Sequence, residues 1–145
     1  MLLPEQDGTC EVSFLLLPEY SMMALLSGIE PLRVANRMAG REVFRWSLVF
    51  TGDEPARASN QLMLQQDSLL RAGECTPKNL FVCASFNAEG YITPELVRWL
   101  QQLHRAGSLL GAIDTGAYFL AAAGLIKPDV PVTLHWEALP AFTEK

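Results

Sequence analysis

The sequence has few cysteines and little positive charge. Cys10, Cys75 and Cys83 are an odd number and no pair has the spacing of a metal site, so neither a disulfide framework nor a zinc site is expected. Eleven basic residues stand against 16 acidic ones, giving a formal net charge of -5 with no basic stripe or tail. The chain is therefore not expected to bind nucleic acid by itself.

Long apolar runs are also missing, so no segment is predicted to span a bilayer, and we expect no membrane partner. The apolar run 12–18 follows acidic residues rather than the basic ones of a signal peptide. We interpret this run as part of a first strand, the protein as cytoplasmic and residues 1–9 as a mobile leader.

The rest of the composition is that of one compact domain, with 145 residues of which 50% are hydrophobic and 19% charged. Short apolar segments alternate with helical patterns, which predicts an α/β layered domain with a mainly parallel sheet flanked by helices. The predicted strands are 11–18, 44–51, 79–84, 108–113 and 131–135, with a further short strand or hairpin arm at 61–65. Loops at the carboxyl ends of such strands are the default ligand site.

The predicted helices are 22–39, 93–106, 115–123 and a last one from Trp136 onward. The first contains Pro31, which removes a helical hydrogen bond, so we expect one kinked helix with Glu30 close to the kink. The second has a clear start in Thr93 and Pro94, a hydroxyl cap followed by proline at the first helical position. No closing strand follows His135, which indicates a domain truncated on its carboxyl-terminal side.

The most informative stretch is 111–125, where a buried strand runs into a tight turn at Asp114 and a small-residue helix leaves at once. This is the layout of a nucleophile elbow, in which the turn residue is exposed at the end of the sheet beside backbone N–H groups. Gly111 and Gly116 allow close approach of helix and strand. His135 follows at the end of a predicted strand.

These motifs resemble the PfpI-type branch of the class I glutamine amidotransferase superfamily. Its pattern is a Gly-Ala-x-Cys-Thr-Gly elbow, a Leu-Ala-x-Ala-Gly-Leu helix and a Thr-x-His-Trp strand. The last combination, with the segments 28–36 and 136–142, is typical of the amino-terminal domains of AraC-type transcription regulators. The resemblance implies a three-layer, flavodoxin-like fold over residues 10–145, with an effector-sensing role. A carboxyl-terminal helix-turn-helix domain, absent from this chain, would bind DNA.

The main departure from the enzymes is Asp114, which stands where they have the nucleophilic cysteine. A carboxylate lacks the nucleophilicity of a thiolate, so we expect no catalytic residue, no enzyme activity, no cofactor and no metal. The resemblance implies that Glu30 faces the elbow residue. We interpret Glu30, Asp114 and His135 as an inherited pocket reused for binding. The full predicted site adds Thr115, Trp136, Ser85 and Phe86.

Simpler interpretations stay open for each of these residues. Asp114 is also consistent with a helix N-cap alone, Glu30 with a solvated helix residue and His135 with a core histidine. Cys83 is best interpreted as a small buried hydrophobe, and Ser85 lacks the strained turn that would present a serine nucleophile. The aromatic residues Tyr118, Phe119 and Trp136 are also consistent with core packing.

Two carboxylates in an aromatic-lined pocket would suit a cationic amine or amino-acid-like metabolite, with Tyr20, Phe86, Tyr118 and Trp136 as candidate aromatic groups. Some AraC-type regulators that resemble this chain respond to betaine-like or amino-acid metabolites. The first hypothesis is therefore a non-catalytic sensor domain that forms a homodimer. The alternatives are a PfpI-type hydrolase or lyase, and a dimerisation module with a vestigial pocket.

Overall fold

A five-stranded parallel sheet forms the centre of the computed structural model, which describes residues 1–3, 5, 8–66, 70–127 and 129–138. The strand order is β3-β2-β1-β4-β5, and each neighbouring pair runs parallel. The strands are β1 Cys10–Leu16, β2 Phe44–Phe50, β3 Leu70–Arg71, β4 Asn79–Ala84 and β5 Leu109–Asp114. The predicted parallel sheet is confirmed.

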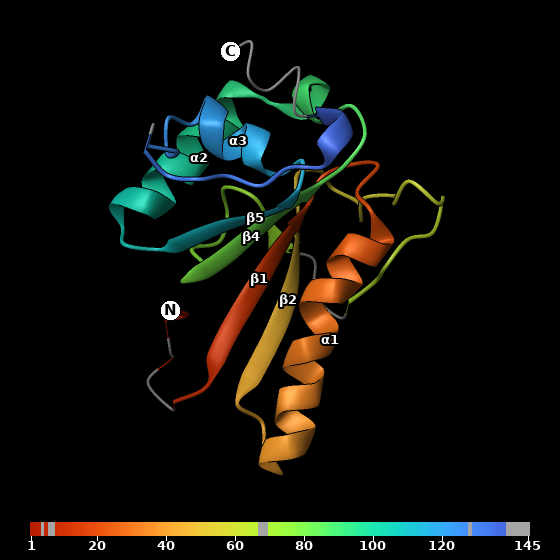
Figure 1. The fold of residues 1–145 in the computed structure, drawn as a ribbon, viewed down its shortest axis with the longest axis vertical. Helices are drawn as coiled ribbons and strands as arrows, with labels where there is room; N and C mark the ends of the chain where they lie inside the picture. Colours follow the sequence, from red (N-terminus) through yellow and green to blue (C-terminus); the bar gives the residue numbers. More distant parts are fainter. Residues whose placement is uncertain (4, 6–7, 67–69, 128, 139–145) are drawn as a thin grey trace.

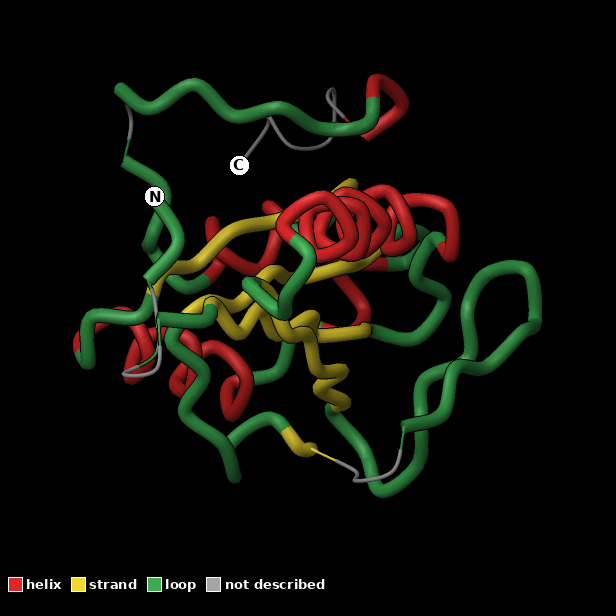
Figure 2. The backbone as a smooth tube through the Cα atoms, turned by 90° about the horizontal axis from the view of Figure 1, so that it is seen from below, coloured by secondary structure: helices red, strands yellow, loops and turns green. Residues whose placement is uncertain are grey.

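Helices cover both faces of this sheet (Figures 1 and 2). Helix α1, Met22–Ala39, packs on one face, while α2, Pro94–Arg105, and α3, Ala117–Ala122, pack on the other. The described residues also contain two single turns of 3-10 helix, η1 at Ala88–Tyr91 and η2 at Trp136–Ala138. None of the helices in the described part of the chain is long and apolar enough to cross a membrane.

Alternation along β1 shows why the sheet is buried on both sides. Phe14 and Leu16 pack with Leu25 of α1, whereas Leu15 packs in the cluster that contains Leu100 of α2. All five side chains are almost completely buried. Because successive side chains of a strand point to opposite faces, a continuous apolar run is the sequence pattern of a strand covered on both faces.

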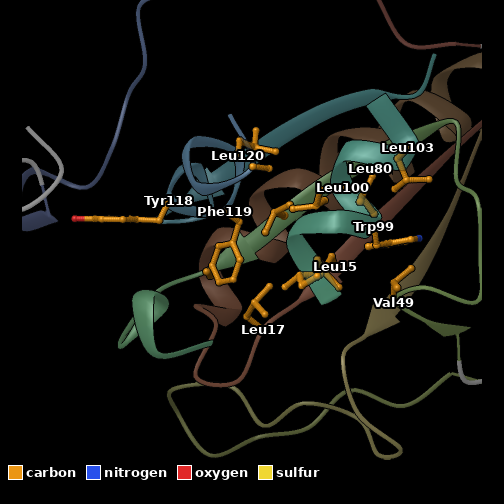
Figure 3. Packing of buried hydrophobic residues seen from close by; sticks show 14 of the residues in the cluster. Leu15, Leu17, Val49, Leu80, Trp99, Leu100, Leu103, Tyr118, Phe119 and Leu120 are labelled. Atoms are coloured by element: carbon orange, nitrogen blue, oxygen red, sulfur yellow. The ribbon is translucent and has the colours of Figure 1, made fainter. Parts of the chain in front are cut away.

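The larger core lies between the sheet and helices α2 and α3 (Figure 3). Leu80 of β4, Trp99 and Leu103 of α2 and Phe119 of α3 are all buried there, and the Trp99 indole N–H donates to the Cys75 carbonyl at 3.0 Å. Burial of one such side chain stabilises the fold by about 1.5–3 kcal/mol. This cluster fixes the start of α3 against the end of the sheet.

Helix α2 begins as predicted, because the Thr93 hydroxyl accepts a hydrogen bond from the Leu96 N–H at 3.2 Å. Helix α1 runs uninterrupted through Pro31, so the prediction of one helix is confirmed. At the amino end of the chain, Leu3 lies against β4, where its N–H donates to Asn79 Oδ1 at 2.7 Å.

Three predictions of local structure differ from the structure, and one short strand was not predicted. Residues 131–135 form no strand, because a strand needs a hydrogen-bonded neighbour and this segment pairs with none among the described residues. The predicted hairpin arm at 61–65 is reduced to one bridge between Arg57 and Met63. Strand β3, only two residues long, gave no detectable pattern. The helix predicted from Trp136 is the turn η2 as far as residue 138, and its continuation lies outside the described residues.

Candidate functional site

The turn after β5 has the geometry of the predicted elbow. Asp114 ends the strand with φ of 57°, in the left-handed region that L-residues rarely adopt, and α3 begins three residues later. Gly116 makes this possible, because a Cβ there would lie 2.0 Å from the Val82 carbonyl oxygen. The elbow is therefore confirmed as a backbone structure.

The alternative in which Asp114 is only a helix N-cap is wrong, because the N-cap of α3 is Gly116 and no side chain caps this helix. Two backbone N–H groups beside Asp114 have partners in the backbone: Thr115 N–H donates to the Ala84 carbonyl at 3.3 Å and Gly116 N–H to the Ile113 carbonyl at 3.1 Å. These two donors are therefore engaged in the backbone rather than presented to an anion.

A pocket of about 1430 Å³ lies beside Asp114. The chain adds β2 and β3 on one side of β1 and then returns to add β4 and β5 on the other side. The order in which strands are added therefore reverses between β1 and β4. In open α/β sheets this switch point is the usual place for a ligand. The loops after β1, β4 and β5 all contribute to the pocket wall, together with the first turns of α1 and the segment around η2.

The pocket lining is acidic and partly aromatic. Its carboxylates are Glu89, Asp114 and Glu137, and no lysine or arginine is among the described lining residues. The aromatic side chains are Phe86, Tyr91 and Tyr118, and four serines line it as well: Ser21, Ser27, Ser59 and Ser85. Such a site has the chemistry to hold a cation by charge and by contact with ring faces.

Five of the seven predicted site residues line this pocket: Ser85, Phe86, Asp114, Thr115 and His135. The Thr115 hydroxyl donates to the Ser85 carbonyl at 2.7 Å, so this side chain also ties the loops after β4 and β5 together. His135 is not a core histidine, because its side chain is 48% exposed, with its Nδ1 3.7 Å from a Glu137 carboxylate oxygen.

Glu30 lies outside the pocket, so the expectation that it faces Asp114 is wrong. Its side chain is 52% exposed and forms an ion pair with Arg33 at 2.7 Å, which lowers the Glu30 pKa mainly through the hydrogen bond. The reason is helical geometry. Gly28 faces the sheet, since a Cβ there would lie 3.2 Å from Ile113 Cδ1. A residue two positions further along points about 200° away, toward solvent.

Two predicted aromatic contributions are also wrong. Trp136 is 74% exposed and does not line the pocket, although its ring centroid is 5.8 Å from that of His135. Tyr20 is fully buried in the core under α1, where burial, together with the nearby Cys83, raises the pKa of its hydroxyl. Tyr118 does line the pocket, although it is buried and belongs to the core cluster drawn in Figure 3, and its hydroxyl donates to the Ala138 carbonyl at 2.9 Å.

Several lining residues were missed by the sequence analysis. Glu89 and Tyr91 lie in the segment that follows β4, so the rule that ligands bind beyond the carboxyl ends of strands could have found them. Ser59 comes from a loop distant in sequence, and only the fold brings it to the pocket. Among the described residues, no group of three or more histidine, cysteine or acidic side chains is arranged to hold a metal ion.

Comparison with known proteins confirms the resemblance to AraC-type regulators with a PfpI-like amino-terminal domain. The HTH-type transcriptional regulator CdhR of Pseudomonas aeruginosa is 44% identical over 134 residues, which cover 90% of this chain and 38% of that protein. The regulator GbdR of the same species is 34% identical over 144 residues, covering 97% of this chain and again 38% of the relative. The chain thus spans about two fifths of the length of these relatives. No family model matches it.

Solved structures agree on the fold. An AraC family transcriptional regulator from Pseudomonas putida superposes with a TM-score of 0.80 at 26% identity, covering 92% of this chain and 71% of the other. A ThiJ/PfpI family protein from Pseudomonas syringae gives a TM-score of 0.63 at 18% identity, covering 83% of this chain and 48% of the other, which shows the fold alone. The predicted flavodoxin-like α/β fold is confirmed.

Proposed function

We propose that this chain is the effector-sensing domain of an AraC-type transcription regulator, and that its pocket binds a small cationic or amino-acid-like metabolite without catalysis. The similarity of this chain to transcriptional regulators supports a regulatory role. The rest of the regulator is also part of the proposal: a cytoplasmic homodimer whose helix-turn-helix domain, encoded outside this chain, contacts DNA. Ligand binding would favour one arrangement of this assembly over another.

The observation that carries the ligand class is the charge of the pocket. Glu89, Asp114 and Glu137 all line one cavity, and no lysine or arginine is among its described lining residues. Phe86 and Tyr91 add ring faces. A cation is attracted by both kinds of group, whereas an anionic ligand would meet three carboxylates.

The proposal of binding without catalysis is supported by the elbow itself. A carboxylate at position 114 is a weak nucleophile, and the N–H groups of Thr115 and Gly116 already donate to backbone carbonyls. An acyl-transfer enzyme needs free donors of this kind to stabilise an oxyanion. The alternative function, a PfpI-type hydrolase or lyase, predicts that the protein converts a substrate and that Asp114→Asn abolishes this activity.

A matched pair of probes tests the charge directly. Choline and its neutral isostere 3,3-dimethyl-1-butanol have nearly the same shape and differ by one positive charge. Each is titrated into the full-length protein by calorimetry and thermal shift, with Asp114→Asn as the pocket variant and Glu54→Gln, an exposed acid outside the pocket, as control. We expect choline to bind and its isostere not to. A hundredfold excess over Kd would stabilise the fold by about 2.7 kcal/mol.

The variants decide where the cation binds. We expect Asp114→Asn to weaken choline binding about tenfold or more, equivalent to about 1.4 kcal/mol, and Glu54→Gln to leave it unchanged. Equal binding of choline and its isostere would refute recognition by charge. No binding by either probe, or by a broader panel of amines and amino acids, together with a stable dimer, would favour a dimerisation module with a vestigial pocket.

A further inference from the structure

A carboxylate outside the pocket is bonded to two residues of the pocket wall. Glu19 follows β1, and its Oε2 accepts hydrogen bonds from Asn87 Nδ2 at 2.7 Å and from the Tyr91 hydroxyl at 3.0 Å. The hydrogen bond to Glu19 also raises the pKa of Tyr91 above its ordinary value. Glu19 itself does not line the pocket, but both of its partners do.

These partners lie at the two ends of η1, and every residue from Asn87 to Tyr91 lines the pocket. A second cavity of about 300 Å³ lies on the far side of this turn, where Thr51 and Trp99 contribute to its lining. Gly90 and Tyr91 line both cavities. The turn η1 is therefore the wall between the pocket and its neighbour.

The backbone of η1 gives this wall little support of its own. It is a 3-10 helix of four residues, and at its two ends Gly90 N–H donates to the Asn87 carbonyl at 2.9 Å and Ile92 N–H to the Glu89 carbonyl at 3.2 Å. Single turns are marginal in isolation because nucleation fixes several dihedral angles for one hydrogen bond. Glu19 and Asn87 both have left-handed φ values, 62° and 52°, a conformation that is uncommon for glutamate and tolerated by asparagine.

We propose that Glu19 is a positioning residue for the pocket: its carboxylate holds η1 at both ends and keeps the pocket wall in the place that separates the two cavities. The importance of this wall for ligand binding rests on the proposed function. The position of the wall does not rest on the proposed function, because the contacts from Glu19 to η1 exist without a ligand. The two ideas can therefore fail separately.

Hydrogen–deuterium exchange of the ligand-free, full-length protein tests the assignment, read by mass spectrometry in peptides covering residues 86–92. We expect Glu19→Ala to accelerate exchange there about tenfold, since loss of two ordinary hydrogen bonds shifts a local opening equilibrium by roughly that factor. Glu19→Gln keeps an acceptor oxygen and should restore exchange to within about twofold of the natural protein. Tyr91→Phe removes one of the two bonds and should lie between.

Peptides from β1 and β4 serve as the internal control, because their exchange must stay slow if each variant is folded. Gln61→Ala is the matched control variant: Gln61 is also left-handed, with φ of 71°, and its side chain is exposed in a neighbouring loop. Unchanged exchange in residues 86–92 of Glu19→Ala would overturn the proposal. So would exchange in Glu19→Gln as fast as in Glu19→Ala, or equal acceleration by Gln61→Ala.

Discussion

Replacing Gly116 by alanine tests whether the elbow depends on direct contact between α3 and the sheet. The new Cβ would lie 2.0 Å from the Val82 carbonyl oxygen, 2.9 Å from its carbonyl carbon and 3.1 Å from the Ile113 oxygen. All three are backbone atoms. Val82 is paired with β1 on one side and β5 on the other, so it cannot move without disturbing both ladders.

The size of the effect follows from this geometry. Ordinary contact begins near 3.4 Å, so the start of α3 must move by more than 1 Å from Val82. Overpacking in a core that can adjust costs about 1–3 kcal/mol. Because backbone blocks the adjustment here, we expect Gly116→Ala to lower the free energy of unfolding by about 3 kcal/mol or more.

Two other glycines provide graded comparisons. A Cβ at Gly111 would lie 2.5 Å from Phe81 Cε1, but this atom is the end of a side chain that can rotate, so we expect a loss of about 1–2 kcal/mol. A Cβ at Gly124 would meet nothing within 4 Å, and its φ of 69° leaves only backbone strain of about 1 kcal/mol. The expected order of destabilisation is Gly116, Gly111, Gly124.

Urea denaturation followed by circular dichroism measures all three variants against the natural protein. The reasoning would be refuted if Gly116→Ala were no less stable than Gly124→Ala. In that case α3 could move away from the sheet freely, and the close approach would not be what fixes Asp114 at the end of β5.

Three further predictions concern the core, a helix cap and a buried thiol. Phe119→Ala should destabilise the fold by about 3–5 kcal/mol, because this fully buried ring fills the cluster between α2, α3 and the sheet; a loss below 1 kcal/mol in urea denaturation would contradict this packing. Thr93→Ala should cost about 1 kcal/mol by removing the cap on the Leu96 N–H, whereas Thr93→Ser should retain most of it; equal stability of the two variants would exclude the cap. Burial raises the pKa of Cys83 far above its ordinary value near 9, so the folded protein holds this proton while the unfolded chain releases it. The stabilising contribution is thus complete below pH 9 and declines above it, by up to about 1.4 kcal/mol per pH unit, and Cys83→Ala should reduce that slope. Denaturation curves between pH 8 and 10 that are parallel for the two proteins would show that this thiol is not buried.

Much of the fold was predictable from local sequence pattern. The run 79–84 matches β4 residue for residue, and Thr93 with Pro94 marks the start of α2 as expected. These signals are local, because burial on both faces requires a continuous apolar run and a helix start requires a specific cap. The prediction for 131–135 failed for the complementary reason: strand formation depends on a pairing partner that no local pattern specifies.

The site residues likewise fall into some that the sequence predicted correctly and some that it did not. Asp114 was found because an elbow is a local structure in which strand, turn and glycine are adjacent in sequence. Glu30 was placed wrongly because its direction depends on which face of α1 meets the sheet, and Gly28 rather than Glu30 occupies that face. The resemblance to the AraC-type regulators does not specify which face of α1 packs on the sheet, and so it did not predict the direction of the Glu30 side chain.

The sequence by itself determined the parallel α/β architecture, the elbow at Asp114 and the placement of a pocket at the strand ends, since each follows from neighbouring residues or from a general rule of sheets. Only the tertiary structure decided the composition of that pocket. Ser59 and Glu137 reach the pocket from separate loops, and Glu19 contacts η1 across about seventy residues of sequence. Contacts between distant segments arise only after the core is packed, and no period or motif in the chain encodes them.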